Sequence, residues 1–297
     1  MANAPSPDIV IDDALVGELL AEQAPDLGDL PRHFMGNGWD NALFRIGEGL
    51  VARLPRREAS SRLINHEVRW LPELAVGLDV DLPLPVFVGE PSAAYPWTWS
   101  VVNLIPGVTA SSIPVADRTV FAERLADALW CLHLPAPADA PLNPWRGVSL
   151  AQDVFDTRVR ERMAGHAASD ELLARWEAWS QAPEFDGVDV WVHGDLHPHN
   201  IIVHPDHTLA GIVDWGDLTA GDPATDLATA WLTFDENGRR LFVDRIDDGG
   251  LMDASTWQRA KAWALYLGLI LQTMSDDMPE LAGIGEHALA QVLAEQA

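Results

Sequence analysis

The sequence predicts an α+β chain of two lobes joined by a short hinge. Short apolar runs around glycine turns dominate before residue 105, which is typical of a small antiparallel sheet. Beyond that point apolar residues recur at helical spacing, interrupted by one group of short strands. The 297 residues are enough for two lobes with their own cores. We place the first lobe at 1–104, the hinge at 105–110 and the second lobe at 111–297.

The first lobe begins with a helical pattern and continues with strands. Residues 12–23 predict a helix, and the runs 41–46 and 50–54 around a Gly-Glu-Gly turn predict a β-hairpin. A helix over 60–74 follows, which we expect Pro72 to fray. Residues 84–88 and 98–105 are strand-like, and Pro106-Gly107 then breaks the chain.

The second lobe is predicted to be mostly helical. Pro114 opens a helical run, and 153–182 holds one long helix or two shorter ones. Three short strands separated by polar loops are expected at 190–192, 201–203 and 209–213. From Pro223 onward the pattern is helical again.

Charge and composition exclude several classes of protein. Asp and Glu number 45 against 19 Lys and Arg, so the net charge of −26 argues against nucleic-acid binding and against docking on anionic membranes. No apolar run is long enough to span a bilayer, and the N-terminus lacks the pattern of a signal peptide. The single cysteine, Cys131, excludes internal disulfides and multi-cysteine metal sites. We expect a cytoplasmic protein.

The densest polar signal is the run His-Gly-Asp-Leu-His-Pro-His-Asn at 193–200, between two predicted strands. Asp214 follows the next strand, and Asp222 and Asp226 lie shortly after it. Phosphoryl transfer from a nucleotide needs a carboxylate for the attacking hydroxyl and oxygen ligands for Mg²⁺. Asp195, Asn200 and Asp214 supply both kinds of group at positions that can converge.

These motifs resemble the aminoglycoside phosphotransferase family, antibiotic kinases with a protein-kinase-like fold, over nearly the whole chain. The resemblance implies a bilobal fold with a small antiparallel N-terminal lobe and a larger, mostly helical C-terminal lobe. It implies that Asp195 is the catalytic base, that Asn200 and Asp214 bind Mg²⁺, and that His193 shapes their loop. Asp217 would lie near the metal or the substrate.

The resemblance also assigns a nucleotide site, for ATP or GTP, to the first lobe. Gly36 and Gly38 would cover the phosphates, and the backbone near Val102 and Leu104 would bind the purine. The family's usual lysine is replaced by Arg53, which would grip the α/β-phosphates while pairing with Glu67, an exchange that a guanidinium permits. The alternative for Arg53 is a solvated strand residue paired with a neighbouring carboxylate.

The function that follows is a Mg²⁺-dependent kinase acting on a hydroxyl of a small molecule, first of all an aminoglycoside-type antibiotic. Residues 111–297 hold 30 acidic and 12 basic side chains, a net −18 that suits a cationic acceptor or serves solubility alone. The alternatives are a macrolide kinase, a kinase of an amino alcohol or sugar, a non-catalytic pseudokinase, and a metal-binding protein built on the histidines. For Asp222 we favour a structural role at a helix start, with Asp226 bracing the same helix.

Overall fold

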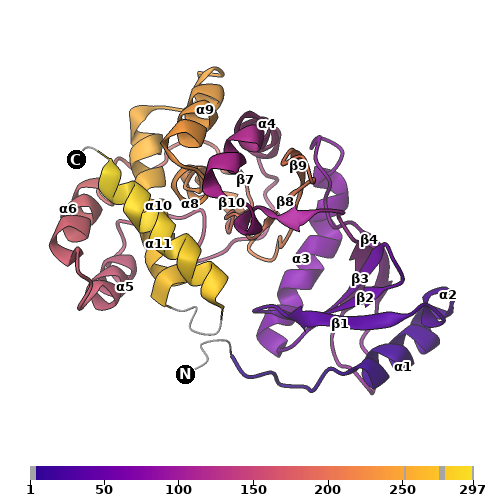
Figure 1. Cartoon of the computed structure of the whole chain (residues 1–297). Helices are drawn as coiled ribbons and strands as arrows, with labels where there is room; N and C mark the ends of the chain where they lie inside the picture. Colours follow the sequence, from indigo (N-terminus) through magenta and orange to yellow (C-terminus); the bar gives the residue numbers. More distant parts are fainter. Residues whose placement is uncertain (1–4, 251, 274–277, 296–297) are drawn as a thin grey trace. The chain divides into compact units, whose positions relative to one another are not determined.

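The computed structural model describes residues 5–250, 252–273 and 278–295 (Figure 1). The chain divides into two compact units, here called the N-terminal unit (residues 4–106) and the C-terminal unit (from Gly107). The N-terminal unit is built on an antiparallel sheet and the C-terminal unit is mostly helical, which confirms the predicted fold class. Each unit is described by itself.

The sheet of the N-terminal unit has five strands in the order β1-β2-β3-β5-β4, and every neighbouring pair is antiparallel. The strands are β1 (Arg32–Asn37), β2 (Asn41–Ile46), β3 (Leu50–Pro55), β4 (Pro85–Gly89) and β5 (Trp99–Asn103). The predicted hairpin is β2 and β3. Strand β1 was not predicted because its side chains are mostly exposed, so it lacks the alternation of a half-buried strand.

Helices cover both faces of this sheet. Helix α1 (Asp13–Gln23) starts at Asp12, whose carboxylate accepts the Leu15 N–H, and its buried leucines pack with one face of β2, β3 and β5. The short helix α2 (Pro25–Gly28) follows. Alternate side chains of β3 point the other way, toward α3 (Glu58–Leu74). Pro72 was expected to fray α3, but the helix includes it and ends only two residues later.

Short strands organise the start of the C-terminal unit. β6 (Val108–Thr109), β8 (Ile201–Val203) and β9 (Leu209–Ile212) form one small sheet, and β7 (Val190–Val192) pairs with β10 (Thr219–Gly221). Gly107, just before β6, has φ +149°, and a Cβ there would lie 2.4 Å from the carbonyl oxygen of Val203. Only glycine allows the chain to approach β8 this closely.

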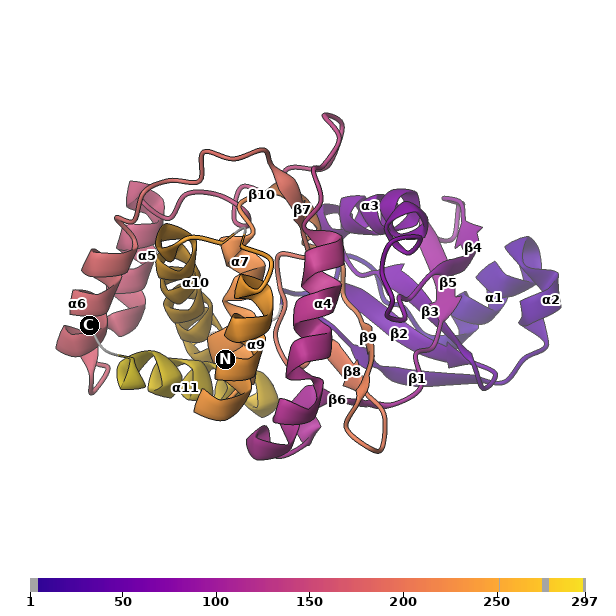
Figure 2. The same ribbon diagram turned by 90° about the horizontal axis from the view of Figure 1, so that it is seen from above.

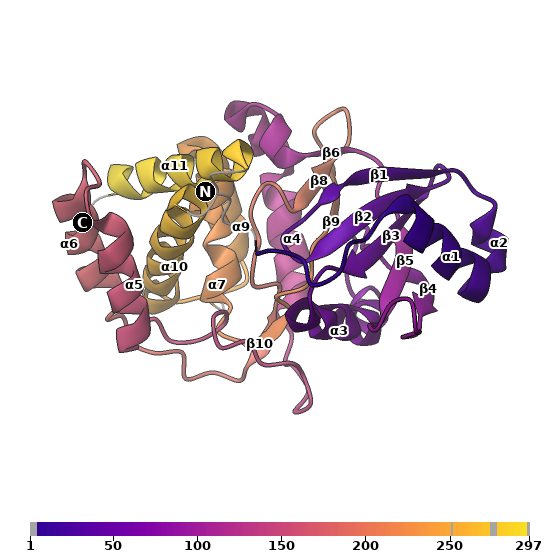
Figure 3. The same ribbon diagram turned by 90° about the horizontal axis from the view of Figure 1, so that it is seen from below.

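The rest of the C-terminal unit is helical. Its helices are the 3₁₀ segments η1 (Ala110–Ser112) and η2 (Val115–Phe121), then α4 (Ala122–Leu132), α5 (Asp153–Met163), α6 (Ser169–Trp179), α7 (Ala224–Leu227), α8 (Thr229–Thr233), α9 (Glu236–Asp247), α10 (Ala254–Thr273) and α11 (Pro279–Ala294). The run 153–182 is therefore two helices. Figures 2 and 3 show α5 and α6 on one side of α10 and α7 on the other, so α10 is the central helix.

Helices α10 and α11 cross with their backbones in close approach. A Cβ on Gly285 would lie 2.4 Å from the Gln272 amide nitrogen and 2.5 Å from the Gly268 carbonyl oxygen. The end of α11 is held by Arg175 of α6, which donates to the carbonyls of Val292, Leu293 and Glu295. Glu295 also lies 3.1 Å from Lys261, the one lysine of the chain.

We predict that Arg175→Met destabilises the protein by about 1–3 kcal/mol, because it leaves the last carbonyls of α11 without their buried donor. The measurement is the free energy of unfolding in urea. The control is Arg160→Met, because Arg160 pairs with Asp156 and Glu177 at the surface, where such pairs contribute less than about 1 kcal/mol. Equal losses in the two variants would contradict the anchoring role of Arg175.

Candidate active site

A buried ion pair joins the two charged residues that the sequence assigns to the nucleotide. Nη2 of Arg53 on β3 donates to Oε1 of Glu67 on α3 at 2.9 Å, and Nη1 donates to Oε2. The two residues are only 7% and 3% exposed. A planar guanidinium matches a carboxylate with two parallel hydrogen bonds, which fixes the direction of the side chain. Arg53 is therefore not the solvated strand residue of the alternative interpretation.

Of the two predicted glycines, Gly36 lies near the end of β1 and Gly38 lies in the turn that leads to β2. Gly36 occupies an irregularity in the pairing of these strands and has φ +146°, a conformation that favours glycine. The Gly38 N–H donates to the Asn41 carbonyl oxygen at 2.8 Å, and its own carbonyl accepts from Arg56. Gly38 thus closes the turn, while Gly36 gives the turn its shape.

The backbone at the end of β5 differs from what the sequence predicted for Val102 and Leu104. Val102 lies inside the sheet, paired with Val51 of β3 and Pro85 of β4. The Leu104 N–H donates to the carbonyl oxygen of Gly49 at 2.9 Å. Neither residue therefore has a free N–H to offer a purine, because both amides are directed toward β3.

The backbone groups of this segment that remain available to a purine are the Asn103 carbonyl and the Ile105 N–H. Antiparallel pairing alternates, so the Asn103 carbonyl points away from β3. On the side that faces β4, the Leu84 N–H already donates to the Leu82 carbonyl, so it does not occupy the Asn103 carbonyl. Within the described residues the Ile105 N–H has no hydrogen-bond acceptor. One acceptor and one donor, two residues apart, are thus left open at this edge.

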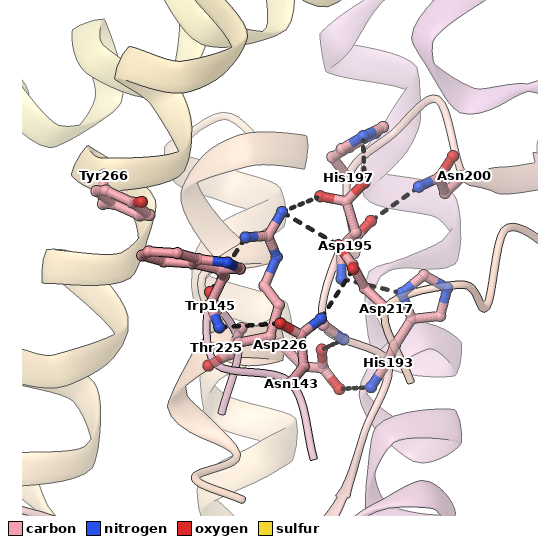
Figure 4. A network of polar contacts seen from close by, with 12 residues as sticks. Asn143, Trp145, His193, Asp195, His197, Asn200, Asp217, Thr225, Asp226 and Tyr266 are labelled. Atoms are coloured by element: carbon pink, nitrogen blue, oxygen red, sulfur yellow. Dashed lines mark hydrogen bonds and ion pairs between the residues drawn. The ribbon is translucent and has the colours of Figure 1, made fainter. Parts of the chain in front are cut away.

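In the C-terminal unit the loop 193–200 connects β7 to β8 and is held from below by Asp226 (Figure 4). The Asp226 carboxylate is completely buried and accepts the N–H groups of His193 at 2.8 Å and Gly194 at 2.9 Å. Nε2 of His133 lies 3.1 Å from the same carboxylate. We expected Asp226 to brace the helix start; its carboxylate instead fixes the start of this loop.

The ring of His193 holds the next turn of the loop. It is fully buried, its Nδ1 accepts the Asp195 N–H at 3.2 Å, and its Nε2 donates to the Val213 carbonyl at 3.0 Å. These partners select the neutral tautomer with hydrogen on Nε2. Gly194, between the two, has φ +88°, and a Cβ there would lie 2.6 Å from the Asp217 carbonyl oxygen.

The Asp195 carboxylate lies between two cationic or polar groups. Its Oδ1 is 3.5 Å from Nη2 of Arg146, and its Oδ2 is 3.4 Å from Nε2 of His197. Burial raises the pKa of Asp195, but His197 and Arg146 outweigh burial and hold that pKa well below its usual range. The side chain is 27% exposed, so an ionised carboxylate is open to a ligand.

Asn200 and Asp214 lie side by side where β8 begins and β9 ends. The Val213 N–H donates to the Asn200 carbonyl oxygen at 2.9 Å, which brings the next residue, Asp214, beside it. The Asn200 Nδ2 donates to the Asp195 carbonyl oxygen, so the amide oxygen faces elsewhere. Within the described residues this oxygen and the Asp214 carboxylate make no hydrogen bond or ion pair.

This oxygen pair fits Mg²⁺, which prefers hard oxygen donors. Asp214 is exposed and has φ +62°, an unfavourable conformation for a residue other than glycine that often marks a functional position. Among the described residues no group of three or more His, Cys, Asp or Glu side chains is arranged to hold a metal ion, which gives the histidine hypothesis no support. Asn200 and Asp214 are a different, mixed donor set.

The remaining carboxylates of the motif have structural partners. Asp217 lies 3.2 Å from Arg146 and accepts a hydrogen bond from Asn143, so it belongs to the surroundings of Asp195. Asp222 accepts the Ala224 N–H at the start of α7 and pairs with Arg259, in line with the predicted structural role. Sequence reasoning missed Arg146 and Asn143, because they lie in a loop without periodicity far from the motif.

Comparison with known proteins now decides the family. Residues 33–263 match the profile of the phosphotransferase enzyme family, APH, which is more than half of the chain. The chain belongs to this family. It is therefore an enzyme of phosphoryl transfer, as the sequence predicted, and the described part of the chain has no helix long and apolar enough to cross a membrane.

Individual relatives are distant and differ in their substrates. Viomycin phosphotransferase of Streptomyces vinaceus is 26% identical, over 78% of this chain and 84% of its own. Thiamine kinase of Escherichia coli O157:H7 is 23% identical, over 74% of this chain and 72% of its own.

Solved structures show the same fold. The GDP and kanamycin complex of the aminoglycoside phosphotransferase APH(2″)-IIIa has a TM-score of 0.70 at 18% identity and covers 94% of this chain and 98% of its own. Macrolide 2′-phosphotransferase MphH of Brachybacterium faecium has a TM-score of 0.63 at 23% identity and covers 96% and 100%. These likenesses show the kinase-like fold.

We predict that Asp226→Asn destabilises the protein by about 1–3 kcal/mol, because an amide offers a single acceptor oxygen to two buried N–H groups. The free energy of unfolding in urea measures the loss. Asp206→Asn is the matched control, because this exposed loop carboxylate accepts from Thr208 and does not hold a buried segment. An Asp226→Asn variant as stable as this control would show that the loop does not depend on the carboxylate.

Proposed function

We propose that the protein is a Mg²⁺-dependent phosphotransferase that moves the γ-phosphoryl group of ATP or GTP to a hydroxyl of a small molecule. The observation that carries this proposal is the Asp195 carboxylate. It is ionised, oriented on both oxygens and partly exposed, on the loop that leads to Asn200 beside Asp214. A pseudokinase has no need of such an arrangement.

Asp195 acts on the attacking hydroxyl. Because its pKa is held low, it accepts a hydrogen bond from the hydroxyl and aligns the oxygen with the phosphorus rather than removing the proton early. That suits phosphoryl transfer, whose loose transition state requires positioning more than a strong base. The proton passes to Asp195 as the new O–P bond forms and the bond between the γ-phosphorus and the β–γ bridging oxygen breaks, which releases the nucleoside diphosphate.

Asn200 and Asp214 would hold Mg²⁺ through the Asn200 amide oxygen and the Asp214 carboxylate. When bound there, the ion would neutralise charge on the nucleotide phosphates. Asn200 also ties its own side chain to the Asp195 backbone, so the ligand and the base belong to one rigid loop. Asp214 is placed by the pairing of Val213 with Asn200.

The N-terminal unit would bind the nucleotide. Arg53, oriented by Glu67, would contact the α/β-phosphates, and Gly36 would shape the turn that covers them. For the purine we propose the Asn103 carbonyl and the Ile105 N–H in place of Val102 and Leu104. Side chains of this segment do not select between adenine and guanine, so ATP and GTP both remain candidate donors.

For the acceptor we propose first an aminoglycoside-type antibiotic or another cationic molecule. The acidic surplus of residues 111–297 supports this choice, together with a relative named for viomycin and a neighbour of the same fold whose structure holds kanamycin. The thiamine kinase relative favours a second candidate, a metabolic kinase with a small cationic alcohol as its acceptor. A macrolide is the third, on the likeness to MphH. A panel of kanamycin, viomycin, erythromycin and thiamine with each nucleotide separates them.

We predict that Asp195→Asn lowers kcat by about 10²–10⁴-fold with the acceptor that the panel identifies. Nucleotide binding should persist, because Asp195 lies outside the N-terminal unit that is proposed to hold the nucleotide. The rate of product formation measures kcat, and the thermal shift produced by Mg²⁺ with ATP or GTP measures nucleotide binding. Asp186→Asn, an exposed loop residue, is the control. Turnover retained by Asp195→Asn would refute its role.

We predict that Arg53→Ala raises the nucleotide KM by about 10–100-fold, the equivalent of losing one charged contact of about 1.5–3 kcal/mol. The change also leaves Glu67 buried without its partner, so folding must be checked. The double variant Arg53→Met/Glu67→Leu removes both charges and separates nucleotide binding from stability. Arg62→Ala, exposed on α3, is the control. An unchanged KM in folded Arg53 variants would contradict the assignment.

A further inference from the structure

A loop that no motif covers contacts the loop 193–200, here called the catalytic loop. It is the segment Pro141–Gly147, here called the brace segment. The Asn143 N–H donates to Oγ1 of Thr219 at 2.9 Å, and the Gly147 N–H donates to Oγ1 of Thr225 at 3.0 Å. The Asp222 N–H returns to the Gly147 carbonyl at 3.0 Å. Both ends of the brace segment are therefore fixed to the elements that follow Asp214.

The brace segment directs one charged side chain to the base. Nη2 of Arg146 lies 3.2 Å from Oδ2 of Asp217 and 3.5 Å from Oδ1 of Asp195, and Nη1 donates to the Trp145 carbonyl at 3.1 Å. Asp217 is itself held by Nδ2 of Asn143 at 2.9 Å. The side chain of Arg146 is only 14% exposed, so these contacts are shielded from solvent. Figure 4 shows the labelled members of this network, which converge from three separate segments of the chain.

We propose that Arg146 is a positioning residue for the Asp195 carboxylate, a role that rests on the function proposed above. Arg146 restrains Oδ1 and His197 restrains Oδ2, so the carboxylate cannot rotate freely about its Cβ–Cγ bond. Asp217 and Asn143 in turn keep the guanidinium in place. The brace segment thus sets the direction from which the base meets the acceptor hydroxyl.

Charge gives a second reason for this arrangement. Asp195 and Asp217 both lie within 3.5 Å of one nitrogen, so without Arg146 two carboxylates would repel each other across a small space. Asp195 would then turn toward solvent, away from the orientation that transfer requires. A displacement of about 1 Å in a reacting group can lower a rate by 10²-fold.

The experiment measures kinase activity with the acceptor identified by the panel of kanamycin, viomycin, erythromycin and thiamine. Arg146→Ala is expected to lower kcat by about 10²-fold while the nucleotide KM changes less than twofold. Arg146→Lys keeps the charge but lacks the fork that reaches Trp145 and both carboxylates, so it should recover only part of kcat. Added methylguanidine should partly restore Arg146→Ala. Arg160→Ala, a surface arginine of α5, should retain wild-type kcat.

Three results would overturn the proposal. One is a kcat of Arg146→Ala within twofold of wild type. Another is full recovery in Arg146→Ala/Asp217→Asn, because the positioning role predicts that relief of the repulsion between the carboxylates restores only part of kcat. A double-mutant cycle between Arg146→Ala and Asp195→Asn, read by urea unfolding, should show non-additive losses, and additive losses would also count against the contact.

A failure of the proposed kinase function can be distinguished from a failure of the role proposed for Arg146. It would appear as wild-type protein that turns over no acceptor in the panel, whatever the mutant cycle shows. In that case non-additive losses in the double-mutant cycle would show that Arg146 and Asp195 form an ion pair, but not that Arg146 positions a base.

Discussion

The site depends on the hydrogen bonds that the buried Asp226 carboxylate accepts from the backbone. The carboxylate satisfies two backbone N–H groups at the start of the loop 193–200, inside a core where unpaired amides would be costly. With that end fixed, the ring of His193 sets the position of Asp195, and the loop reaches Asn200 with only a few residues free to move. Hydrogen bonds to the backbone thus set the path of the loop, and side-chain contacts from Arg146 and His197 then orient the Asp195 carboxylate.

The two units orient their charged site residues in different ways. In the N-terminal unit, Arg53 on β3 is oriented by its buried ion pair with Glu67 on α3. In the C-terminal unit, Asp195 is oriented by residues from the brace segment, the catalytic loop and the segment after β9.

Short sequence patterns predicted the features that depend on residues close together in the sequence. The β2–β3 hairpin, the strands around the loop 193–200 and the family followed from short motifs, because spacing and turn residues act over a few positions. Arg146 was not predictable, since it precedes Asp195 by a stretch that contains two helices and carries no motif of its own. Asp226 was noticed but given the wrong partner, because its carboxylate crosses the unit to a loop formed earlier in the chain. For the purine, the sequence motif marked the segment around Val102 and Leu104, but strand alternation, which the motif does not contain, decides which amides stay free there.

The exchange of lysine for arginine at position 53 has a chemical consequence. A guanidinium presents its charge through a planar fork of N–H donors, whereas a lysine ammonium presents it at one nitrogen. It also lacks a primary amine. The only lysine, Lys261, lies in the other unit beside Glu295. Reagents that acylate amines, including nucleotide analogues designed to label the usual kinase lysine, would find no target on this strand.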